Sequence, residues 1–533
     1  MKLPSDSEIP EAFRLGSPIE QRKWLLGGKL VQWNGPLNDV LSPVWQSTPD
    51  GPKPRLLGST PLLTTKESLE ALDAAVKAYD HGRGEWPTMS VQNRIDHVEK
   101  FVVAMKAKRA EVVKLLMWEI GKTLKDSEKE FDRTVDYIVD SINALKEIDR
   151  TSAKLVQEQG IMGQVRRVPL GVALCMGPYN YPLNETFSTF IPALLMGNAV
   201  ILKPAKFGVL LMRPLLEPLR DSFPPGVVNV IYGRGRETVG ALMESGKIDV
   251  LAFIGTNKGA RELKKMHPLP HRLKAVLGLD AKNIGVVMQD ANLDEAVSEC
   301  LLGSLSFNGQ RCTALKLLLV HKSVEKAFTE KFSAAVSALK LGLPWEAGVS
   351  ITALPEPGKT EWLTELVKDA TSKGARVVNA DGGKIDGWYF TPAVVGGVTK
   401  EMRLFHEEQF GPVVPIGTYD DDQEAIDAIV ESPFGQQVSL FGKDPERLGR
   451  FIDACAHQVG RINLNAQCQR GPDTFPFNGR KDSAEGTLSI HDALRVFSIR
   501  SLVATKATDA NKKIVREILN DHHSTFLSTE FIL

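Results

Sequence analysis

Several features that would assign this chain of 533 residues to a specialised class of protein are missing. Its 65 Lys and Arg residues balance its 65 Asp and Glu residues, so no net charge attracts nucleic acid or an anionic membrane. No uninterrupted apolar stretch reaches the ~18 residues of a membrane-spanning helix, and the start, MKLPSDSEIPEAF, lacks the regions of a secretory signal. We therefore expect a cytoplasmic protein whose partners are small molecules or copies of itself, with no nucleic acid and no membrane.

Cysteine is scarce, and its spacing excludes the usual metal and redox motifs. The five cysteines are scattered and form no Cys-x-x-Cys pair, so we expect reduced thiols. His267 and His271 are four residues apart, as helical metal ligands often are, but Pro268 and Pro270 interrupt any helix between them. The sequence predicts no metal site.

What the sequence does contain is an alternation of short β-rich segments with helical ones. Between Val168 and Met288, runs such as GVALCMG, AVILKPA, GVVNVIYG and DVLAFIG alternate with helical runs, and the same order resumes after Asp290. This pattern predicts βαβ units with parallel sheets that are buried on both faces. A chain of this length exceeds one hydrophobic core, so we expect a second α/β domain to begin near residue 280.

Three segments fall outside this pattern. The stretch from Val91 to about Ile148 has helical periodicity and many charges, which predicts a helical layer before the first sheet. AKLVQEQ and QVRRVPLGVALCMG, joined by GIMG, predict a protruding hairpin, and such an arm often pairs with another subunit. After about Ser501 the chain is charged and helical at NKKIVREILND.

The turn SFNGQRCTAL carries Cys312 between an apolar helical run and an apolar strand-like run. A thiol becomes a nucleophile as its thiolate, which nearby positive charge and partial exposure favour, and Arg311 with the polar turn supplies some of these conditions. Free cysteine is also among the most commonly buried residue types. This turn alone is consistent with two interpretations of Cys312, as a nucleophile or as a small core residue.

Further candidate segments follow predicted strands, at the sheet edge where open α/β folds bind ligands. GPYNYP presents Asn180, whose amide can donate to an oxyanion or bond its own turn. LKPAK places Lys203 and Lys206 where two cations suit the phosphate and ribose of a nucleotide, or simply meet solvent. GRGRETVG looks like a dinucleotide loop but lacks the third glycine of that fingerprint.

GPYNYP, LKPAK, PPGVVNVIYGRG, FIGT, FNGQRC and HEEQFGPV occur together in an order and at spacings that resemble the aldehyde dehydrogenase superfamily, over roughly residues 25 to 505. EFDRTVDYI, the QRC triplet and QCQRGPDTFPF are more narrowly similar to its non-phosphorylating glyceraldehyde-3-phosphate dehydrogenases, which use NADP and yield 3-phosphoglycerate. The resemblance implies an α/β fold with two Rossmann-like parallel-sheet domains, a small β oligomerisation arm, and a homodimer or homotetramer. It divides the chain into a cofactor-binding domain (1–149 and 170–279), a catalytic domain (280–480), the arm (150–169 and 481–505) and a C-terminal helical tail (506–533).

The resemblance also implies roles for individual residues. Cys312 would add to the aldehyde, and Asn180 with the Cys312 backbone N–H would hold the oxyanion. Hydride would then pass to the nicotinamide, and water would hydrolyse the thioester. Lys206 stands where NAD-preferring relatives often carry a glutamate, so we expect NADP, with NAD as the alternative. The positions implied to bind the cofactor are Met176, Pro178, Lys203, Lys206, Gly235, Phe253, Gly255, Thr256, Glu408 and Phe410.

The phosphate of such a substrate is a dianion and needs converging donors. Guanidinium groups suit it because they present fork-shaped pairs of N–H groups. The positions that match the family's substrate site come from distant parts of the chain, and they are Arg133, Tyr181, Arg311, Thr313 and Arg470.

One segment departs from the family pattern. The E-L-G-G-K segment, whose glutamate is the usual base for thioester hydrolysis, appears here as GLDAKN, which puts Gly278 at the glutamate position. Asp280 is our candidate base if its loop turns inward, and otherwise it caps a turn. Glu407 and Glu408 are further acids that could activate water.

This departure keeps two other functions open. A CoA-acylating semialdehyde dehydrogenase passes its acyl group to CoA and needs no hydrolytic base. A nucleotide-binding homologue that has lost turnover needs none either, but it would require neither Cys312 nor Asn180.

Overall fold

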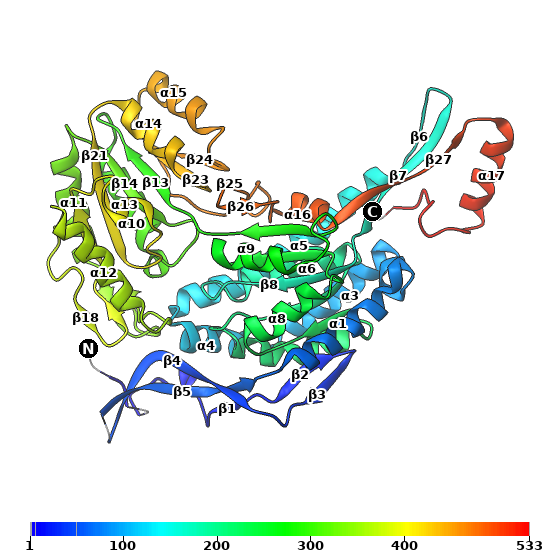
Figure 1. Ribbon diagram of the computed structural model, residues 1–533, viewed down its shortest axis with the longest axis horizontal. Coiled ribbons are helices and arrows are strands. Elements are labelled where there is room, and N and C mark those ends of the chain that lie inside the picture. The colour runs from blue at the N-terminus through cyan, green and yellow to red at the C-terminus, as the bar shows by residue number, and fades with distance from the viewer. Residues whose placement is uncertain (1–2, 6, 50, 532–533) are drawn as a thin grey trace.

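The computed structural model describes residues 3–5, 7–49 and 51–531. Figure 1 shows two sheet-and-helix units and an arm that projects from one of them. Among the described residues, the larger sheet has eight strands and the next has seven, and parallel strands form the centre of both. The predicted α/β class with two parallel-sheet units is therefore confirmed.

The first sheet has the order β26-β12-β11-β8-β9-β10-β2-β3, with parallel strands from β12 to β10 and antiparallel strands at both edges. All of β8 and most of β9 are buried, because helices cover both faces of the sheet. The strands are β2 (Lys23–Leu26), β3 (Lys29–Gln32), β8 (Val172–Met176), β9 (Ala199–Lys203), β10 (Val228–Val230), β11 (Val250–Ile254), β12 (Lys274–Gly278) and β26 (Ala484–Glu485).

Helices with polar caps surround this sheet. Thr64 and Glu67 form a capping box at the start of α1, and the Thr123 hydroxyl accepts the Asp126 N–H (3.2 Å) at the start of α5. The predicted charged helical layer is present as α3, α4 and α5. The helices are α1 (Thr65–Tyr79), α2 (Glu85–Thr88), α3 (Val91–Lys106), α4 (Arg109–Ile120), α5 (Leu124–Ser152), α6 (Asn184–Leu195), η3 (Leu210–Leu215), α7 (Leu216–Ser222), α8 (Gly235–Glu244), α9 (Asn257–Met266) and α16 (Ile490–Val496).

The second sheet has the order β17-β20-β21-β14-β13-β23-β24, and all its strands except the edge strand β17 run parallel. Every residue of β13, β14 and β23 is buried. The strands are β13 (Asn283–Val287), β14 (Leu315–His321), β17 (Arg376–Val377), β20 (Ala393–Gly396), β21 (Val413–Tyr419), β23 (Gln437–Phe441) and β24 (Arg461–Leu464). Its helices are α10 (Leu293–Leu305), η4 (Ser306–Gly309), α11 (Glu325–Ser337), α12 (Lys359–Ser372), α13 (Arg403–His406), α14 (Asp422–Glu431) and α15 (Pro445–Cys455).

The arm is an antiparallel sheet in the order β27-β7-β6. The predicted hairpin forms two of its strands, but the end of its second run, Val172–Met176, forms β8 of the first sheet instead. The strands of the arm are β6 (Leu155–Glu158), β7 (Ile161–Pro169) and β27 (Ser498–Lys506), and the predicted tail helix follows as α17 (Asp509–Asn520) (Figure 1).

Residues 481–497, which the sequence analysis places in the arm, lie elsewhere. β26 pairs with β12 of the first sheet, and α16 contacts α5 and α6. The apolar side chains Ile490, Ala493 and Leu494 are buried there, which removes more apolar surface from water than a place in the exposed arm would.

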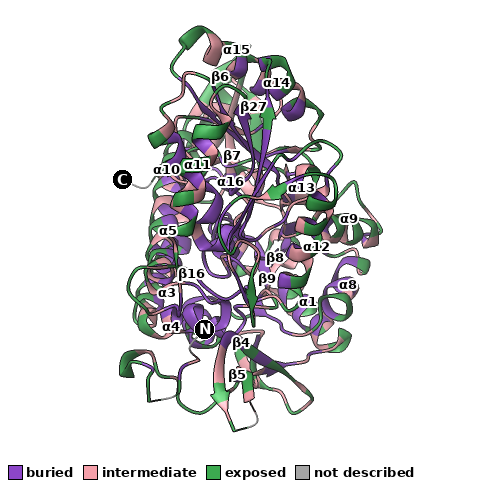
Figure 2. Cartoon of the chain, turned by 90° about the vertical axis from the view of Figure 1, so that its left-hand side faces the viewer, coloured by how far each residue is buried: buried purple, intermediate pink, exposed green. Residues whose placement is uncertain are grey.

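The remaining elements are short or peripheral. Within the described chain no helix is long and apolar enough to cross a membrane. Figure 2 shows buried central strands, such as β8 and β9, behind helices whose outer faces are exposed. These elements are η1 (Glu11–Phe13), β1 (Ile19–Glu20), β4 (Leu37–Thr48), β5 (Gly51–Pro61), η2 (Asp80–Gly82), β15 (Lys340–Leu341), β16 (Val349–Ile351), β18 (Ile385–Asp386), β19 (Tyr389–Phe390), β22 (Phe434–Gly435) and β25 (Arg480–Lys481).

Candidate active site

Cys312 lies in the turn between η4 and β14, and it is half-buried. The turn is tightly folded, because Phe307, Asn308 and Gly309 all have positive φ values. At Gly309 a Cβ atom would lie 2.7 Å from the Gly411 carbonyl oxygen, so a side chain would not fit. The Asn308 side chain accepts the Thr352 N–H (2.9 Å) and donates to the Thr352 hydroxyl (3.0 Å), which holds the turn in place.

The groups around Cys312 shift the pKa of its thiol in opposite directions. Burial raises the pKa of Cys312 above its usual value, and the negative charge of Glu185 raises it further. Lys316 and Arg470 lower it, as does a hydrogen bond with Gln436. Because the net shift is upward, the resting thiol is protonated at neutral pH and needs to lose its proton when it attacks.

Although Arg311 directly precedes Cys312, it is not among the main groups that shift the pKa of the thiol. Its Nη2 donates to the carbonyl oxygens of Leu302 (3.1 Å) and Gly303 (2.8 Å) near the end of α10. The guanidinium therefore caps carbonyl groups in the last turn of this helix. It still lies close enough to Tyr181 to lower the pKa of that phenol, which burial raises.

Asn180, which follows β8 of the first sheet, contacts the turn that carries the nucleophile. Its side-chain amide donates to the Gln310 carbonyl oxygen (2.8 Å), two residues before Cys312, and its side chain is buried. The neighbouring Tyr179 hydroxyl donates to the Gln310 side-chain oxygen (3.2 Å). Asn180 therefore bonds to a turn 130 residues away rather than to its own turn.

A buried ion pair that the sequence analysis missed supports the Asn180 loop. Lys122 and Glu130 are fully buried and paired, and the Lys122 ammonium donates to the Asn180 carbonyl oxygen (2.8 Å). Glu130 also accepts the N–H groups of Leu183 (3.0 Å) and Asn184 (3.2 Å) where α6 begins. In the sequence, both residues lie in a charged helical region that looks solvated, so no local signal identifies them.

The implied cofactor residues gather at the carboxyl ends of β8, β9 and β11. Met176 ends β8, and Pro178 follows it. Thr256 caps α9, where its hydroxyl accepts the Gly259 N–H (3.1 Å). At Gly255 a Cβ atom would lie 2.3 Å from the Phe253 ring, so the chain passes closely over that ring. The free N–H groups of a helix start suit a pyrophosphate.

Two lysines and a glycine complete this side of the site. Lys203 ends β9, and burial lowers its pKa to about 8. Lys206 is exposed, with its ammonium 5.0 Å from the centre of the Phe207 ring, and it pairs with no carboxylate in the part of the chain that the structure describes. Gly235 begins α8, and a Cβ atom added there would meet no atom within 4 Å. These residues, together with the start of α9, fit a nicotinamide dinucleotide.

Glu408 and Phe410 face this region from the second sheet. Glu408 accepts the Ala281 N–H (3.2 Å) and pairs with Lys316. Burial raises the pKa of Glu408, while Lys316 lowers it. The ring of Phe410 lies 5.9 Å from that of Tyr179 in an edge contact. Lys316 is the second residue of an apolar strand, LKLLLVH, so no local pattern in the sequence marks it as a site residue.

Two of the three arginines implied to hold the substrate's phosphate are already paired with carboxylates. Arg133 forms a two-pronged contact with Asp473 (2.8 and 2.7 Å), and Arg470 pairs with Glu185 and lies 3.2 Å from Asp473. The two cations and two carboxylates balance one another. Sequence reasoning missed both carboxylates, because Glu185 lies 285 positions from Arg470 and Asp473 lies 340 positions from Arg133. Thr313, beside the nucleophile, is buried.

The candidate bases named from the sequence are engaged elsewhere. Asp280 accepts the Asn257 N–H (2.8 Å) at the first turn of α9. Of the two roles considered for Asp280, a base or a cap, this hydrogen bond is that of a cap. Glu407 pairs with Arg403 (2.7 Å). At Gly278 an added Cβ would meet Ile254 at 3.4 Å, an ordinary contact, so nothing in the packing excludes a side chain there.

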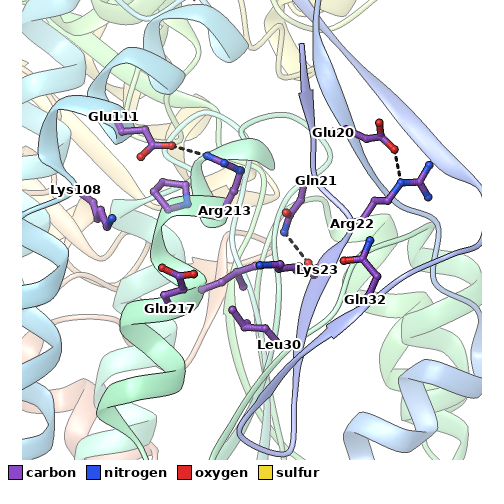
Figure 3. A pocket seen from close by; sticks show the side chains of 12 residues that line it. Glu20, Gln21, Arg22, Lys23, Leu30, Gln32, Lys108, Glu111, Arg213 and Glu217 are labelled. Carbon is purple, nitrogen blue, oxygen red and sulfur yellow. Dashed lines mark hydrogen bonds and ion pairs between the residues drawn. The ribbon is translucent and has the colours of Figure 1, made fainter. Parts of the chain in front are cut away.

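Two other places on the molecule bear on the choice of site. A pocket of about 390 Å³ lies between β2, β3 and η3 (Figure 3), and none of the site residues named from the sequence is among the described residues that line it.

His267 bonds to the Ile248 carbonyl oxygen (3.0 Å) and the Leu269 N–H (3.1 Å), as a structural histidine does. No three His, Cys, Asp or Glu residues of the described chain gather as metal ligands.

The sequence and the fold of this chain are both similar to those of known proteins. A family model described as "Aldehyde dehydrogenase family" matches residues 52–502. The NADP-dependent glyceraldehyde-3-phosphate dehydrogenase of Arabidopsis thaliana is 31% identical over 80% of this chain and 86% of its own length, and that of Streptococcus equinus is 31% identical over 85% and 92%. The crystal structure of NADP-dependent glyceraldehyde-3-phosphate dehydrogenase from Bacillus halodurans C-125 complexed with NADP is similar, with a TM-score of 0.83 and 29% identity, covering 92% of this chain and all of that one.

Proposed function

Because the chain belongs to the aldehyde dehydrogenase family, we propose that it oxidises glyceraldehyde 3-phosphate with NADP and water to 3-phosphoglycerate. The observation that carries the proposal is the contact between Asn180 and the Cys312 turn, which sets an amide donor beside a half-buried thiol. The relatives' names and the residues that match their phosphate site support this substrate among aldehydes.

In this reaction Cys312 adds to the aldehyde carbon, and its proton leaves the site. The oxyanion that forms is held by the Asn180 amide and the Cys312 backbone N–H, donors that are fixed before the reaction begins. The bound cofactor supplies the acceptor for the hydride. The tight packing of the turn around Asn308 and Gly309 keeps the sulfur in position while the thioester forms.

For the cofactor we propose NADP rather than NAD. Lys206 is exposed and unpaired with any carboxylate among the described residues, so it is available to a 2′-phosphate. In Lys206→Glu, kcat/KM for NADP should fall at least about 10-fold, because a charged hydrogen bond is worth about 1.5–3 kcal/mol. The value for NAD should change much less. Equal losses with both cofactors would contradict the assignment.

The larger units have proposed roles as well. We propose that the first sheet with its helices binds the cofactor and that the second sheet carries the nucleophile. The antiparallel arm would join subunits into a dimer or tetramer, since Val156, Leu502 and Val503 leave apolar side chains exposed on it. Free thiols at all five cysteines are compatible with the proposed cytoplasmic location.

The test is NADPH formation from glyceraldehyde 3-phosphate in buffer without inorganic phosphate. The wild-type protein should form NADPH, and Cys312→Ser should lose that activity while still binding NADPH. Full activity in Cys312→Ser would overturn the proposal.

The glycine at position 278 favours a second candidate, transfer of the acyl group to CoA. Adding CoA to the same assay separates the two, since a strict requirement for CoA would replace hydrolysis with acyl transfer. Cofactor binding without NADPH formation from any aldehyde would instead indicate a homologue that has lost turnover.

A further inference from the structure

Hydrolysis of a thioester needs a group that takes a proton from water, and Gly278 leaves the family's usual base missing. Asp280, Glu407 and Glu408 are each held by other partners. The negative charge of another carboxylate, Glu185, raises the pKa of the Cys312 thiol. Glu185 lies in the first turn of α6, directly after the loop whose Asn180 amide bonds to the Gln310 carbonyl oxygen, two residues before Cys312.

The position of Glu185 follows from the start of α6. Its backbone N–H donates to the Tyr181 carbonyl oxygen (3.1 Å), so the helix begins immediately after the loop that presents Asn180. The side chain is 8% exposed and is paired with Arg470. The same short segment thus supplies the oxyanion donor and a carboxylate.

Arg470 holds Glu185 in the structure. The side chain of Arg470 is 4% exposed, and the rings of Phe477 and Tyr137 lie 4.7 and 5.8 Å from its guanidinium. This ion pair is shielded from water, and it holds the carboxylate on Arg470. The titratable groups whose electrostatic interactions include Glu185 are Lys122, Arg133, Tyr137, Cys312 and Arg470.

We propose that Glu185 is the proton acceptor in hydrolysis, and that the substrate's phosphate frees it by taking its place on Arg470. The proposal rests on the function proposed above, because it needs a thioester on Cys312 and a phosphorylated substrate. Arg470 is one of the positions that match the family's phosphate site, so the same guanidinium serves two anions in turn. A phosphate dianion competes well for it, because guanidinium and phosphate form paired, charged hydrogen bonds.

The chemical step balances with water as the only added reactant. The water oxygen bonds to the acyl carbon while Glu185 takes one proton from that water, and the carbon–sulfur bond breaks with its electron pair returning to the sulfur. The product is a carboxylic acid, which loses its proton to solvent. Glu185 then gives its proton to the Cys312 thiolate, and the site regains its starting state.

The experiment separates the first turnover from the later ones. Enzyme is mixed rapidly with NADP and glyceraldehyde 3-phosphate, and NADPH is followed through the initial burst into the steady state. In Glu185→Gln the burst should remain, whereas the steady-state rate should fall about 100-fold, a typical contribution of a general base. Glu111→Gln removes a carboxylate that pairs with Arg213 near the pocket of Figure 3, and it should change neither phase.

Two results would overturn the inference and leave the function intact: an unchanged steady-state rate in Glu185→Gln, or a full burst with lost turnover in Asp280→Asn. Absence of a burst in the wild-type enzyme would overturn the proposed function together with the inference.

A second measurement needs no variant and tests the release from Arg470. With unphosphorylated glyceraldehyde, nothing displaces Glu185, so the burst should be followed by slow turnover. Added inorganic phosphate should then raise the steady-state rate in a saturable way. A rate that does not respond to phosphate would contradict the exchange on Arg470.

Discussion

The carbonyl oxygen of Cys312 accepts hydrogen bonds from the Lys316 ammonium (2.9 Å) and the Asn283 amide (2.8 Å). These donors lie at the amino ends of β14 and β13, so the second sheet fixes the backbone of the nucleophile. Lys316 adds a positive charge that favours the thiolate, whereas Glu185 disfavours it. The reactivity of the thiol is thus set by residues that are not its neighbours in the sequence.

Replacing Lys316 by Met tests this balance. Loss of the cation destabilises the thiolate, so the pKa of Cys312 should rise, and the pH profile of its alkylation should shift to higher pH. The rate of inactivation by iodoacetamide as a function of pH measures the shift. Glu185→Gln should move the profile the opposite way, and Lys322→Met, on the exposed surface, should not move it. A shift to lower pH in Lys316→Met would contradict this account.

Position 278 offers a gain of function. Since an added Cβ meets Ile254 at an ordinary 3.4 Å, we expect Gly278→Glu to fold and to place a carboxylate at the end of β12. Combined with Glu185→Gln, it should restore part of the about 100-fold lost in turnover. Steady-state NADPH formation measures the recovery, with Gly278→Gln as the matched control. Equal rates for the Glu and Gln variants would show that the new carboxylate does not act as a base.

At the scale of elements, the loop between β8 and α6 depends on helix α5. Glu130 of α5 bonds the N–H groups that open α6, and Lys122 just before α5 bonds the Asn180 carbonyl oxygen. Both side chains are fully buried, so neither charge is compensated by water. The loop that presents the oxyanion donor is therefore fixed by a charge pair from a neighbouring helix.

Breaking this pair should be costly. Glu130→Gln leaves the Lys122 cation buried without its counter-charge, and removing one partner of a buried ion pair typically costs about 3–5 kcal/mol. Urea unfolding should show a loss of that size, and kcat should fall because the Asn180 loop is no longer held. The double variant Lys122→Met, Glu130→Met removes both charges and should recover much of the stability. A single variant as stable as the wild type would refute the role of the pair.

At the scale of the whole molecule, the site forms where the two sheet units meet. The alternating segments made both sheets predictable, and the motifs at strand ends indicated which residues to examine. Glu185, Asp473, Lys122 and Lys316 were not predictable, because a charged residue in a single sequence most often lies at the surface. Their partners are identified only when distant segments, such as those of Glu185 and Arg470, fold together.

The C-terminal tail is a separate part of this architecture. The Ser528 N–H donates to the Gln164 side-chain oxygen (3.0 Å) and the Ser528 carbonyl accepts from Arg166 (3.0 Å), while Leu527 is buried against the arm. Removal of residues 508–533 should expose apolar surface on the arm, including Leu155 and Met162, and promote self-association.

Size-exclusion chromatography with light scattering measures this change. Because the tail helix α17 lies far from β14, the strand that follows Cys312 (Figure 1), the burst of NADPH per subunit should remain unchanged in the truncated protein. An unaltered elution profile would show that the tail does not protect the arm.

The central claim is that Cys312 carries the acyl group during aldehyde oxidation. It is tested most directly by quenching the enzyme with acid just after the burst with NADP and glyceraldehyde 3-phosphate, followed by peptide mass spectrometry. We predict one NADPH per subunit, with a phosphoglyceroyl adduct on the peptide that contains Cys312, at a higher level in Glu185→Gln than in the wild-type enzyme. An adduct on another residue, or NADPH formation with Cys312 unmodified, would contradict the account.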